Sequence, residues 1–579
     1  MIELSGRRGL NWPATRFLPG ARAGVGPRAF ACLVSAEWRW VILVTLASLL
    51  LIEIPYLFAY SQVFRGRAFV GMLWAPDDFA QYSAAMREGA ASASWLIHDH
   101  LTSEPHAPAL MYTFYVALGK LAGVLGVEFQ LAFHLAEIAA RATLLVSIYL
   151  FCREVLSNVG ERRLALVLIV LSSGLAASLV LGALIVGADF KLPTAEFRRP
   201  ELSTFVVMFT APHVALGLAL LLLSGRSYLA SWSAPGLRSP AAAGLTVLCL
   251  GLTHPYSLVT LVAVIAAHLT AMWIRRRTPP RSALLSAAMV FLVASPFLVY
   301  SVLVFGGDPF WSAAYGQQNI QYSAQLPELV VGFGAVLGLA ALGFPRFLRQ
   351  PTPGGWLVVV WIAVSLVLMY LPVSVQRRFA FGLHPMLGVV AAVGLEPIWR
   401  WARRVRRFPL ALMRPVTLVC LGQLLFGSTL LLYVAMVREM WDPSERVDSA
   451  GVFYPVSLTE AARWLAVVMD SEDVLLSEPH TGNYFAGIVP GRVFVGHWVA
   501  TLDSWDKLRG MQRFFLADGD DEVRARFLVS NNIRYVVYGP YERSLGARPP
   551  PASPYLRQVY ANAEVSIYRV DLAPPTNSP

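Results

Sequence analysis

Apolar runs of roughly 20 residues recur along the chain from about residue 40 to about residue 437, separated by short polar stretches rich in Arg. A run of this length is what an α-helix needs to cross a bilayer. Within 241–274, the motif His254-Pro255-Tyr256 breaks a stretch too long for one span into two short helices. The pattern predicts eleven spans at about 40–60, 129–152, 164–187, 204–224, 241–274 (two), 283–305, 329–345, 355–372, 380–396 and 410–436. The expected fold is therefore mainly α, a polytopic helical membrane bundle.

One apolar segment, 110–126, is excluded from this count because it is short and carries Lys120 near its middle. We expect it to lie in the membrane interface or to re-enter the membrane. Leaving it out places Arg153, Arg162 and Arg163 on the cytoplasmic side, whereas counting it as a crossing would invert every later loop. The predicted protein is thus multi-pass in the inner or plasma membrane, with a cytoplasmic N-terminus and an extracytoplasmic C-terminus.

From about residue 440 the pattern becomes that of a soluble domain. A helical stretch at 459–469 precedes strand-like runs at 474–476, 492–495, 535–538, 558–560 and 565–569. Strands alternating with helices predict an α/β unit. We expect three parts: a basic cytoplasmic segment 1–39, a transmembrane domain 40–437 whose first external loop is 61–128, and an extracytoplasmic α/β domain 438–579.

Composition supports the membrane assignment and narrows the partners. Of 579 residues, 56% are hydrophobic and 14% are charged, whereas a soluble protein carries about 25% charged residues. The net charge of +11 comes from Arg clusters between spans, which the positive-inside rule explains without a nucleic-acid partner. The apolar run near 41–60 lacks a small-residue cleavage site and is expected to be an uncleaved span. The four Cys show neither metal spacing nor a disulfide framework.

The first external loop concentrates polar chemistry. Asp77 and Asp78 follow a Pro and precede a helical pattern. Adjacent carboxylates cannot both face one point on a helix, so one could accept a proton from a nucleophilic hydroxyl while the other binds substrate or caps the helix. Glu104 and His106 stand just before the interfacial segment, where Glu could position an acceptor and His could donate to a phosphate. The pair His98 and His100 leaves open a divalent metal site.

Charged residues in and beside the spans add two further groups. His134, Glu137 and Arg141 share one face of a predicted span, which indicates either a structural ion pair or a catalytic role. Four Arg lie on the side opposite to the positive-inside bias, where bidentate contacts to a lipid phosphate, or contact with ordinary anionic lipid, would explain them: Arg198, Arg199, Arg377 and Arg378. His213 and His254 either line the same cavity or are core histidines.

The C-terminal domain contains two attractive motifs, Ser477-Glu478-Pro479-His480 and Gly496-His497-Trp498. Neither is accompanied by a nucleophile elbow or a phosphate-binding glycine loop. We therefore expect this domain to pack against the membrane part or to shape an acceptor, not to hold a second active site.

These motifs together resemble a known family. The chain resembles the membrane-embedded GT-C glycosyltransferases, in particular the bacterial protein mannosyltransferase and aminoarabinose transferase group. The matching motifs lie within about residues 74–155: Asp77-Asp78 through Tyr82, His106-Ala107-Pro108-Ala109-Leu110 through Tyr112 and on to Lys120-Leu121, and Arg141. The group has a Pro pair where this chain has Ala107-Pro108. In the C-terminal domain no motif matches.

The resemblance implies transfer of a sugar from a polyprenyl-phosphate donor to a lipid, glycan or protein acceptor on the extracytoplasmic face. It favours Asp77 as the catalytic carboxylate with Asp78 supporting it, while Glu104 and His106 shape the site. Arg377, Arg378 or Arg199 would stabilise the leaving lipid phosphate. No cofactor is firmly implied, and a divalent metal stays open.

Three other functions are weighed against this one. The main alternative is a multi-span transporter or flippase for a lipid-linked or anionic substrate, which often shows repeated halves and charges at the midplane; the chain shows no repeat. A lipid-sugar polymerase or ligase of another fold would also use external Arg. A scaffold that only presents the C-terminal domain would leave the Asp pair unexplained.

Overall fold

A computed structural model describes residues 36–187, 195–275, 278–318, 320–349, 352–404, 410–442, 451–516, 521–546, 550 and 553–571. The basic N-terminal segment predicted to be cytoplasmic lies mostly outside the described residues. Residues 1–47 and 48–579 form two separate compact units. The side chains of the candidate site all belong to the larger unit, residues 48–579.

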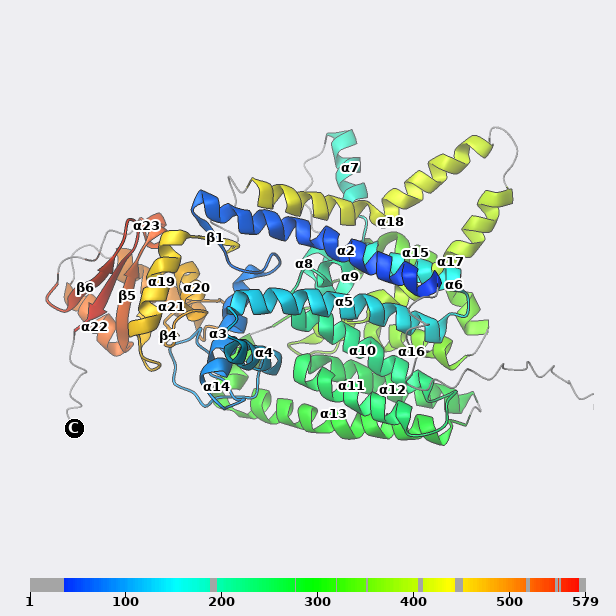
Figure 1. The fold of residues 1–579 in the computed structure, drawn as a ribbon, viewed down its shortest axis with the longest axis horizontal. Coiled ribbons are helices and arrows are strands. Elements are labelled where there is room, and N and C mark those ends of the chain that lie inside the picture. Colours follow the sequence, from blue (N-terminus) through cyan, green and yellow to red (C-terminus); the bar gives the residue numbers. More distant parts are fainter. Residues whose placement is uncertain are drawn as a thin grey trace, which may run out of the picture. The chain divides into compact units, whose positions relative to one another are not determined.

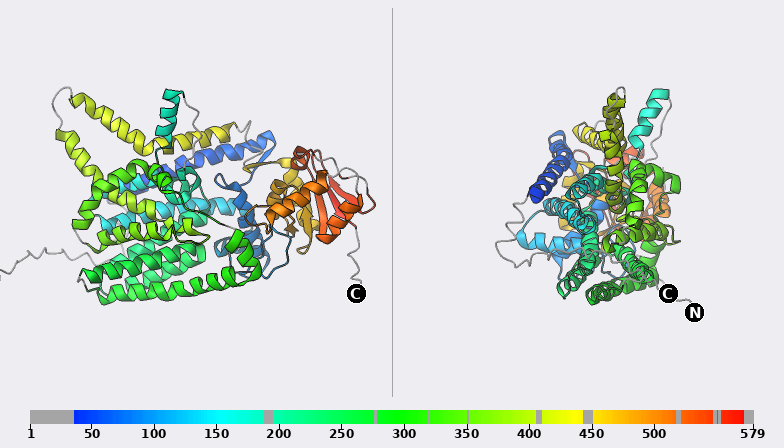
Figure 2. Two further views of the ribbon diagram at one scale, coloured as in Figure 1. Left: turned by 180° about the vertical axis from the view of Figure 1, so that it is seen from behind. Right: turned by 90° about the vertical axis from the view of Figure 1, so that its right-hand side faces the viewer.

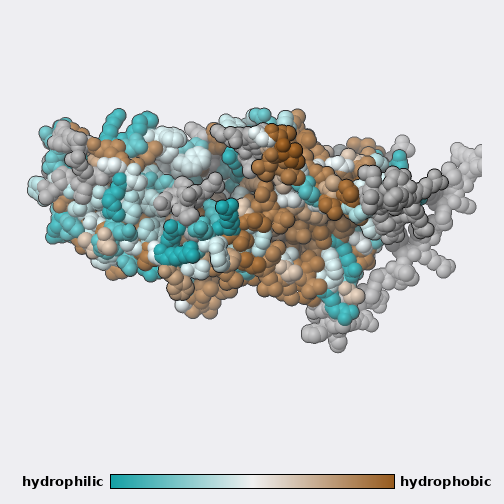
Figure 3. All heavy atoms as spheres, turned by 90° about the horizontal axis from the view of Figure 1, so that it is seen from above, coloured by the Kyte–Doolittle hydropathy of each residue, from teal (hydrophilic) through white to brown (hydrophobic). Residues whose placement is uncertain are grey.

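Long apolar helices make up most of the larger unit (Figure 1). They are α2 (Ala36–Ser61), α5 (Phe129–Val155), α6 (Val159–Leu171), α7 (Ala176–Val186), α10 (Pro212–Ala230), α11 (Arg238–Thr253), α12 (Tyr256–Ile274), α13 (Arg281–Gly307), α15 (Leu326–Arg349), α16 (Pro353–Leu368), α17 (Leu383–Arg404) and α18 (Leu410–Trp441). On the face drawn in Figure 3, hydrophobic side chains gather over these helices and hydrophilic ones over the C-terminal domain. The chain is a multi-pass membrane protein.

The number of spans depends on how the shorter helices are counted. Within the described residues, eight helices are long and apolar enough to cross a membrane, and the pair α6 and α7, bent by 59°, would be a ninth. Every stretch predicted to cross is helical, but α11 and α16 have only 16 residues each. The count of eleven therefore stays a prediction. The break expected at His254 is confirmed, because its φ of −147° and ψ of 71° end α11.

Short helices follow the first long one. α3 (Phe79–Ala91) and α4 (Thr113–Leu125) belong to the segment between α2 and α5, which we call the first loop (residues 62–128). α4 has 13 residues, too few to cross a membrane, as expected from Lys120. The remaining short helices are α8 (Ala195–Arg198), α9 (Thr204–Val207) and α14 (Pro309–Trp311).

The C-terminal part is an α/β domain, as predicted. Its sheet has the order β4-β3-β5-β7-β6, with β3 parallel to β4 and β5, and β7 antiparallel to β5 and β6. The strands are β3 (Val474–Leu476), β4 (Arg492–Val493), β5 (Ile533–Tyr538), β6 (Leu556–Ala561) and β7 (Ser566–Val570). The helices are α19 (Val456–Val468), α20 (Pro479–Ala486), α21 (Ser504–Leu516), α22 (Asp521–Ser530) and α23 (Pro540–Ser544).

The first loop and the C-terminal domain are built together, which the sequence pattern did not predict. β1 (Arg67–Phe69) pairs antiparallel with β2 (Phe453–Pro455). A second backbone contact joins Thr102 to Val495 in an isolated bridge. Figure 1 and the left view of Figure 2 show the yellow-to-red C-terminal domain beside the blue first loop. Side chains from both segments can therefore form one site.

Candidate active site

The adjacent carboxylates Asp77 and Asp78, here called the aspartate pair, stand on a sharp turn in the first loop. Ala75 has φ +50°, and residues Pro76–Asp78 form one 3₁₀ turn that leads into α3. Asp78 occupies the N-cap position of α3, but its side chain accepts no capping hydrogen bond. The helix-cap interpretation is therefore not supported for Asp78, and its carboxylate is available for other contacts. The backbone carbonyl of Asp77 accepts a 3.0 Å hydrogen bond from Asn483 Nδ2 of α20.

Asp78 faces a cationic and aromatic environment. Its Oδ1 lies 3.3 Å from His497 Nε2 of the C-terminal domain. Burial alone would lower the pKa of His497, but the hydrogen bond and charge of Asp78 outweigh it and raise that pKa. The charge of Asp78 also acts on Tyr82 and Arg378. Asp78 thus stabilises the protonated, cationic form of His497.

Asp77 faces the C-terminal domain instead. A side chain on Gly451, which has φ +65°, would collide with Asp77 Oδ1. The charge of Asp77 acts on Tyr454 and His480. Burial raises the pKa of Asp77, and the nearby His497 and His480 only partly oppose this effect. A carboxylate with a raised pKa is a stronger base than an exposed one.

Arg377 and Arg378 share one buried acid on the side of Asp78. Glu201 is almost fully buried, and its Oε1 lies 3.3 Å from Arg377 Nε and 3.5 Å from Arg378 Nη1. Two guanidinium groups against one carboxylate leave an excess of one positive charge. Arg378 is the member whose charge also reaches Asp78 and Tyr256. The arrangement can accommodate an anion next to the aspartate pair.

Other residues expected to bind substrate lie around this cluster. Tyr82 of α3 stacks on Tyr115 with ring centroids 4.3 Å apart. His254 is buried, its Nδ1 lies 2.8 Å from Ser257 Oγ, and its ring stacks on Phe381 at 4.8 Å. Arg199 pairs with Glu328 at 2.7 Å, whereas Arg198 is exposed. Arg378 is thus the predicted phosphate-binding Arg that shares its surroundings with Asp78.

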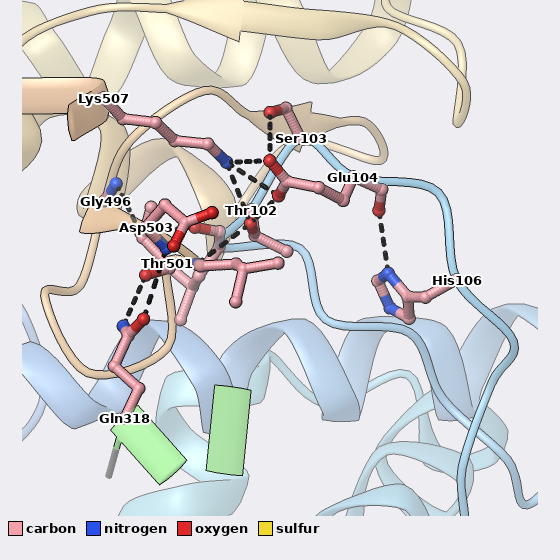
Figure 4. A network of polar contacts seen from close by, with 11 residues as sticks. Thr102, Ser103, Glu104, His106, Gln318, Gly496, Thr501, Asp503 and Lys507 are labelled. Atoms are coloured by element: carbon pink, nitrogen blue, oxygen red, sulfur yellow. Dashed lines mark hydrogen bonds and ion pairs between the residues drawn. The ribbon is translucent and has the colours of Figure 1, made fainter. Parts of the chain in front are cut away.

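Glu104 is engaged in the contact between the first loop and the C-terminal domain (Figure 4). Lys507 Nζ of α21 lies 2.7 Å from both carboxylate oxygens of Glu104 and donates to Thr102 Oγ1 at 3.1 Å. Thr102 also donates to Glu104. The neighbouring Thr501 hydroxyl donates to the Leu101 carbonyl at 2.6 Å. Glu104 therefore holds the two segments together, and a direct contact with substrate stays a prediction.

His106 is fixed by hydrogen bonds on both ring nitrogens. Its Nε2 accepts a 2.9 Å bond from the backbone N–H of Asp99, and its Nδ1 lies 2.8 Å from the Glu104 carbonyl, which can only accept. The ring is therefore neutral with the proton on Nδ1. It also stacks on Phe310 at 3.9 Å. Because both ring nitrogens are engaged in these bonds, His106 positions the loop. In this arrangement neither nitrogen is free for the predicted donation to a phosphate.

Comparisons with known proteins address the fold. No family model matches the chain, and no curated protein matches it by sequence. Among solved structures, the oligosaccharyltransferase of Archaeoglobus fulgidus matches with a TM-score of 0.54 and 13% identity, over 86% of this chain and 69% of that one. ArnT of Cupriavidus metallidurans matches with a TM-score of 0.51 and 14% identity, over 92% and 98%. The arabinofuranosyltransferase AftD from Mycobacteria matches with a TM-score of 0.53 and 15% identity, over 93% of this chain and 42% of that one.

The chain has the GT-C fold. The proteins it resembles are GT-C glycosyltransferases, so the resemblance seen in the Asp77-Asp78 motif is confirmed at the level of fold. At 13–15% identity the likeness extends no further.

Arg141 holds helices of the GT-C bundle together. Its Nε donates to the Met208 carbonyl at 2.6 Å, and its other nitrogens contact Glu53 at 3.0 Å, Tyr56 at 2.7 Å and Glu137 at 3.1 Å. These contacts engage all three guanidinium nitrogens. They are those of a structural ion pair between Arg141 and the two acids, which is one of the two interpretations left open by the sequence. Its role in substrate binding stays a prediction.

The metal site suggested by His98 and His100 has another explanation. Both rings contact Glu88, at 2.9 Å from His98 Nδ1 and 3.2 Å from His100 Nε2. In the part of the chain that the structure describes, no group of three or more His, Cys, Asp or Glu is placed to hold a metal. The possible divalent metal therefore stays a prediction, and the proposed reaction uses none.

Two residues beside the aspartate pair could not be found from the sequence. The Gly-His-Trp motif of His497 indicates only packing, because nothing in the pattern shows that the C-terminal domain reaches Asp78. No sequence motif marks Tyr454 as a site residue. It is relevant only because β2 pairs with β1 and brings it beside Asp77. Both depend on long-range contacts between segments about 375–420 residues apart, which local patterns do not contain.

Replacing Lys507 by Met should lower the free energy of unfolding by about 1–3 kcal/mol, because Glu104 would lose its buried cation. Thermal unfolding of the detergent-solubilised full chain measures the effect. The control is Arg509→Met on the same helix, whose side chain is 61% exposed and pairs with an exposed Asp; its effect should stay within about 0.5 kcal/mol. Equal effects of the two substitutions would show that the Lys507–Glu104 contact contributes no more to the free energy of unfolding than an exposed ion pair does.

Replacing Gly451 by Ala should displace Asp77 and lower activity by about tenfold, since small misplacements of catalytic groups are costly. Gly546→Ala is a matched control: Gly546 also has positive φ (+81°), but a Cβ added there would meet no described atom within 4 Å. Both variants carry the same kind of backbone strain. A loss of activity in Gly546→Ala as large as in Gly451→Ala would attribute the effect to strain and not to Asp77.

Proposed function

We propose that this protein is a glycosyltransferase that moves a sugar from a polyprenyl-phosphate-linked donor to an acceptor on the extracytoplasmic face of the membrane. The observation that carries the proposal is the Asp77-Asp78 turn, set in a GT-C fold with Arg378 on one side and the C-terminal domain on the other. Carboxylates beside an excess cation suit an acceptor hydroxyl and a leaving phosphate.

The two carboxylates take different roles in this proposal. Asp77, whose pKa is raised, accepts the proton of the acceptor hydroxyl. The hydroxyl oxygen forms a bond to the anomeric carbon of the donor sugar while the bond from that carbon to the phosphate oxygen breaks. The lipid phosphate leaves with its negative charge next to Arg378, and Asp78, which contacts His497, supports the donor sugar.

A lipid-linked donor is supported by chemistry and by one related fold. The excess charge of the Arg377–Glu201–Arg378 cluster lies at the end of a candidate membrane span, Gln376–Trp401. A phosphate on a lipid carrier would meet the cluster there without leaving the membrane. The Archaeoglobus fulgidus enzyme has been solved with dolichol-phosphate, a polyprenyl phosphate, with a TM-score of 0.53 to this chain.

The test is sugar transfer in membranes that contain the overexpressed protein. Radiolabelled polyprenyl-phosphate sugars are supplied as donors, and label in water-soluble, lipid and protein fractions is measured for the wild type and for the double variant Asp77→Asn/Asp78→Asn. The proposal expects transfer only with the wild type. Vectorial movement of lipid-linked sugar that persists in the double variant would instead support a flippase.

A further inference from the structure

A cavity of about 330 Å³ lies between the first loop and the C-terminal domain, on the side of Asp77. Pro76, which precedes Asp77, is part of its wall, as are Arg87 of α3, Arg463 of α19 and Asn483 of α20. The volume is at the lower end of the range for small-molecule sites and has room for about one sugar ring with a substituent. None of the residues proposed above to bind the donor lines it.

Arg87 is a partly buried cation in this wall, and two of its guanidinium nitrogens are not satisfied. Its Nε and Nη2 atoms are buried and make no hydrogen bond to any residue that the structure describes. The negative charge of Glu88 acts on Arg87, but the Glu88 carboxylate already contacts His98 and His100. Burial lowers the pKa of Arg87 to about 10, so the group is still charged at neutral pH. A buried unpaired charge is costly, so an anionic ligand is the simplest reason for keeping it there.

A second polar group in the wall is also incomplete. Asn483 donates through Nδ2 to the Asp77 carbonyl, but its buried Oδ1 has no hydrogen-bond partner among the described residues. Oδ1 is an acceptor, and a ligand hydroxyl would supply the missing donor. Because the same amide is bonded to Asp77, a hydroxyl held by Asn483 would lie close to the proposed base.

The rest of the wall suits an acidic saccharide. Tyr454 and Tyr484 stack with centroids 4.1 Å apart, giving an aromatic surface with hydroxyl groups. The wall contains two cationic residues, Arg87 and Arg463, and one acid, Glu128, so it carries an excess positive charge. Aromatic rings, hydroxyl partners and an unpaired guanidinium together match a sugar ring that bears an oxyanion.

We propose that this cavity binds the acceptor, and that the acceptor is a saccharide carrying a carboxylate or phosphate group held by Arg87. The assignment of the bound saccharide as the acceptor rests on the proposed function. The existence of a site for an anionic sugar is argued independently, from Arg87, Asn483 and the cavity. One hydroxyl of the sugar would contact Asn483 Oδ1 and point toward Asp77. The donor phosphate would lie at Arg378, on the other side of the aspartate pair.

The test uses the full-length protein in detergent micelles and equilibrium dialysis with three radiolabelled probes: glucuronate, glucose 6-phosphate and glucose. At least one anionic probe should bind about tenfold or more tightly than glucose, and Arg87→Met should remove that preference. The two anionic probes distinguish carboxylate from phosphate as the preferred group. The matched control is Arg526→Met, on an exposed side chain of α22 that is 72% accessible; it should change binding less than twofold.

Thermal unfolding separates a binding role of Arg87 from a structural one. Removing an unpaired buried charge should leave the unliganded protein equally or more heat-stable in Arg87→Met, while the shift caused by the anionic probe disappears. A large loss of stability without ligand would identify a structural Arg and overturn the proposal. Equal binding of all three probes would overturn it as well.

A competition arm tests the source of the anion. If undecaprenyl phosphate displaces the anionic probe, the cavity holds the donor phosphate and the acceptor assignment is wrong. The outcomes also separate this inference from the proposed function. Transfer activity with unchanged probe binding in Arg87→Met defeats only the inference, whereas Arg87-dependent binding in a protein without transfer activity defeats only the proposed function.

Discussion

Replacing Asp77 by Asn is expected to lower the rate of sugar transfer by about 10²- to 10⁴-fold, the usual contribution of a positioned general base. Asn keeps the shape of the side chain but cannot accept the proton of the acceptor hydroxyl. The backbone carbonyl of residue 77 would still accept the hydrogen bond of Asn483, so the turn should persist. The measurement is the initial rate of label transfer at matched expression, with donor in excess.

Two further variants make the result specific. Asp506→Asn changes an Asp that is 74% exposed on α21 and should leave transfer unchanged. Asp78→Asn should also impair transfer, since the charge of Asp78 acts on Arg378, but its residual activity should keep the pH dependence set by Asp77. If Asp77→Asn transfers sugar as fast as the wild type, Asp77 is not the base, and a rate loss confined to Asp78→Asn would move that role to Asp78.

The pH profile provides an independent check on Asp77. A general base works when deprotonated, so activity should fall as the pH drops through the pKa of Asp77. Because burial raises that pKa, the fall should begin at a higher pH than for an exposed Asp, whose pKa is about 3.9. The residual activity of Asp77→Asn should lack this acidic limb. Initial rates measured from about pH 4 to pH 8 would show it.

Local patterns in the sequence predicted the parts of the fold that local physics decides. Apolar runs marked the helices, because a bilayer requires about 20 apolar residues per crossing. Lys120 correctly set α4 apart as a short helix, and Pro255 marked the break after α11. The alternation of the C-terminal runs predicted strands that match β3 to β7 within a few residues. Each of these signals lies within one element.

The candidate site was only partly predictable, because its geometry depends on contacts between distant segments. The aspartate pair stands out in a short motif, whereas the partners that Glu104 and His106 find within the protein do not. Neither Lys507 nor the Asp99 backbone is a visible partner in the sequence. Likewise, Arg87 has no pattern that distinguishes it from a solvated Arg. Only the packing of α3 against the C-terminal domain leaves it buried and unpaired among the described residues.

The division of the site into two sides follows from the same packing. Asp78 contacts His497 and its charge acts on Arg378, whereas Asp77 lies against Gly451 and its charge acts on Tyr454. Adjacent residues on a turn point in different directions, so one short motif can serve both a leaving phosphate and an incoming hydroxyl. The C-terminal domain completes both sides, which explains why a GT-C fold would keep it attached through β1 and β2.

Replacing Arg378 by Met should lower kcat by about 10²- to 10³-fold, the usual effect of removing one group that stabilises developing negative charge. The leaving phosphate gains charge in the transition state, so kcat should fall more than KM rises. Arg378→Lys keeps the charge but loses the two-pronged donor geometry, and should recover only part of the rate. Initial rates over a range of donor concentrations separate the two parameters.

The adjacent Arg377 provides a control matched in chemistry, position and partner. Both guanidinium groups contact Glu201 Oε1, so either Met variant leaves that buried acid with one cation. The charge of Arg378 reaches Asp78 and Tyr82, whereas the groups that act on Arg377 are Glu201, Arg378 and Arg199. Arg377→Met should therefore lower kcat much less than Arg378→Met. Equal losses would mean that the cluster acts only by its net charge or by stabilising the fold, and the assignment of the leaving phosphate to Arg378 would be wrong.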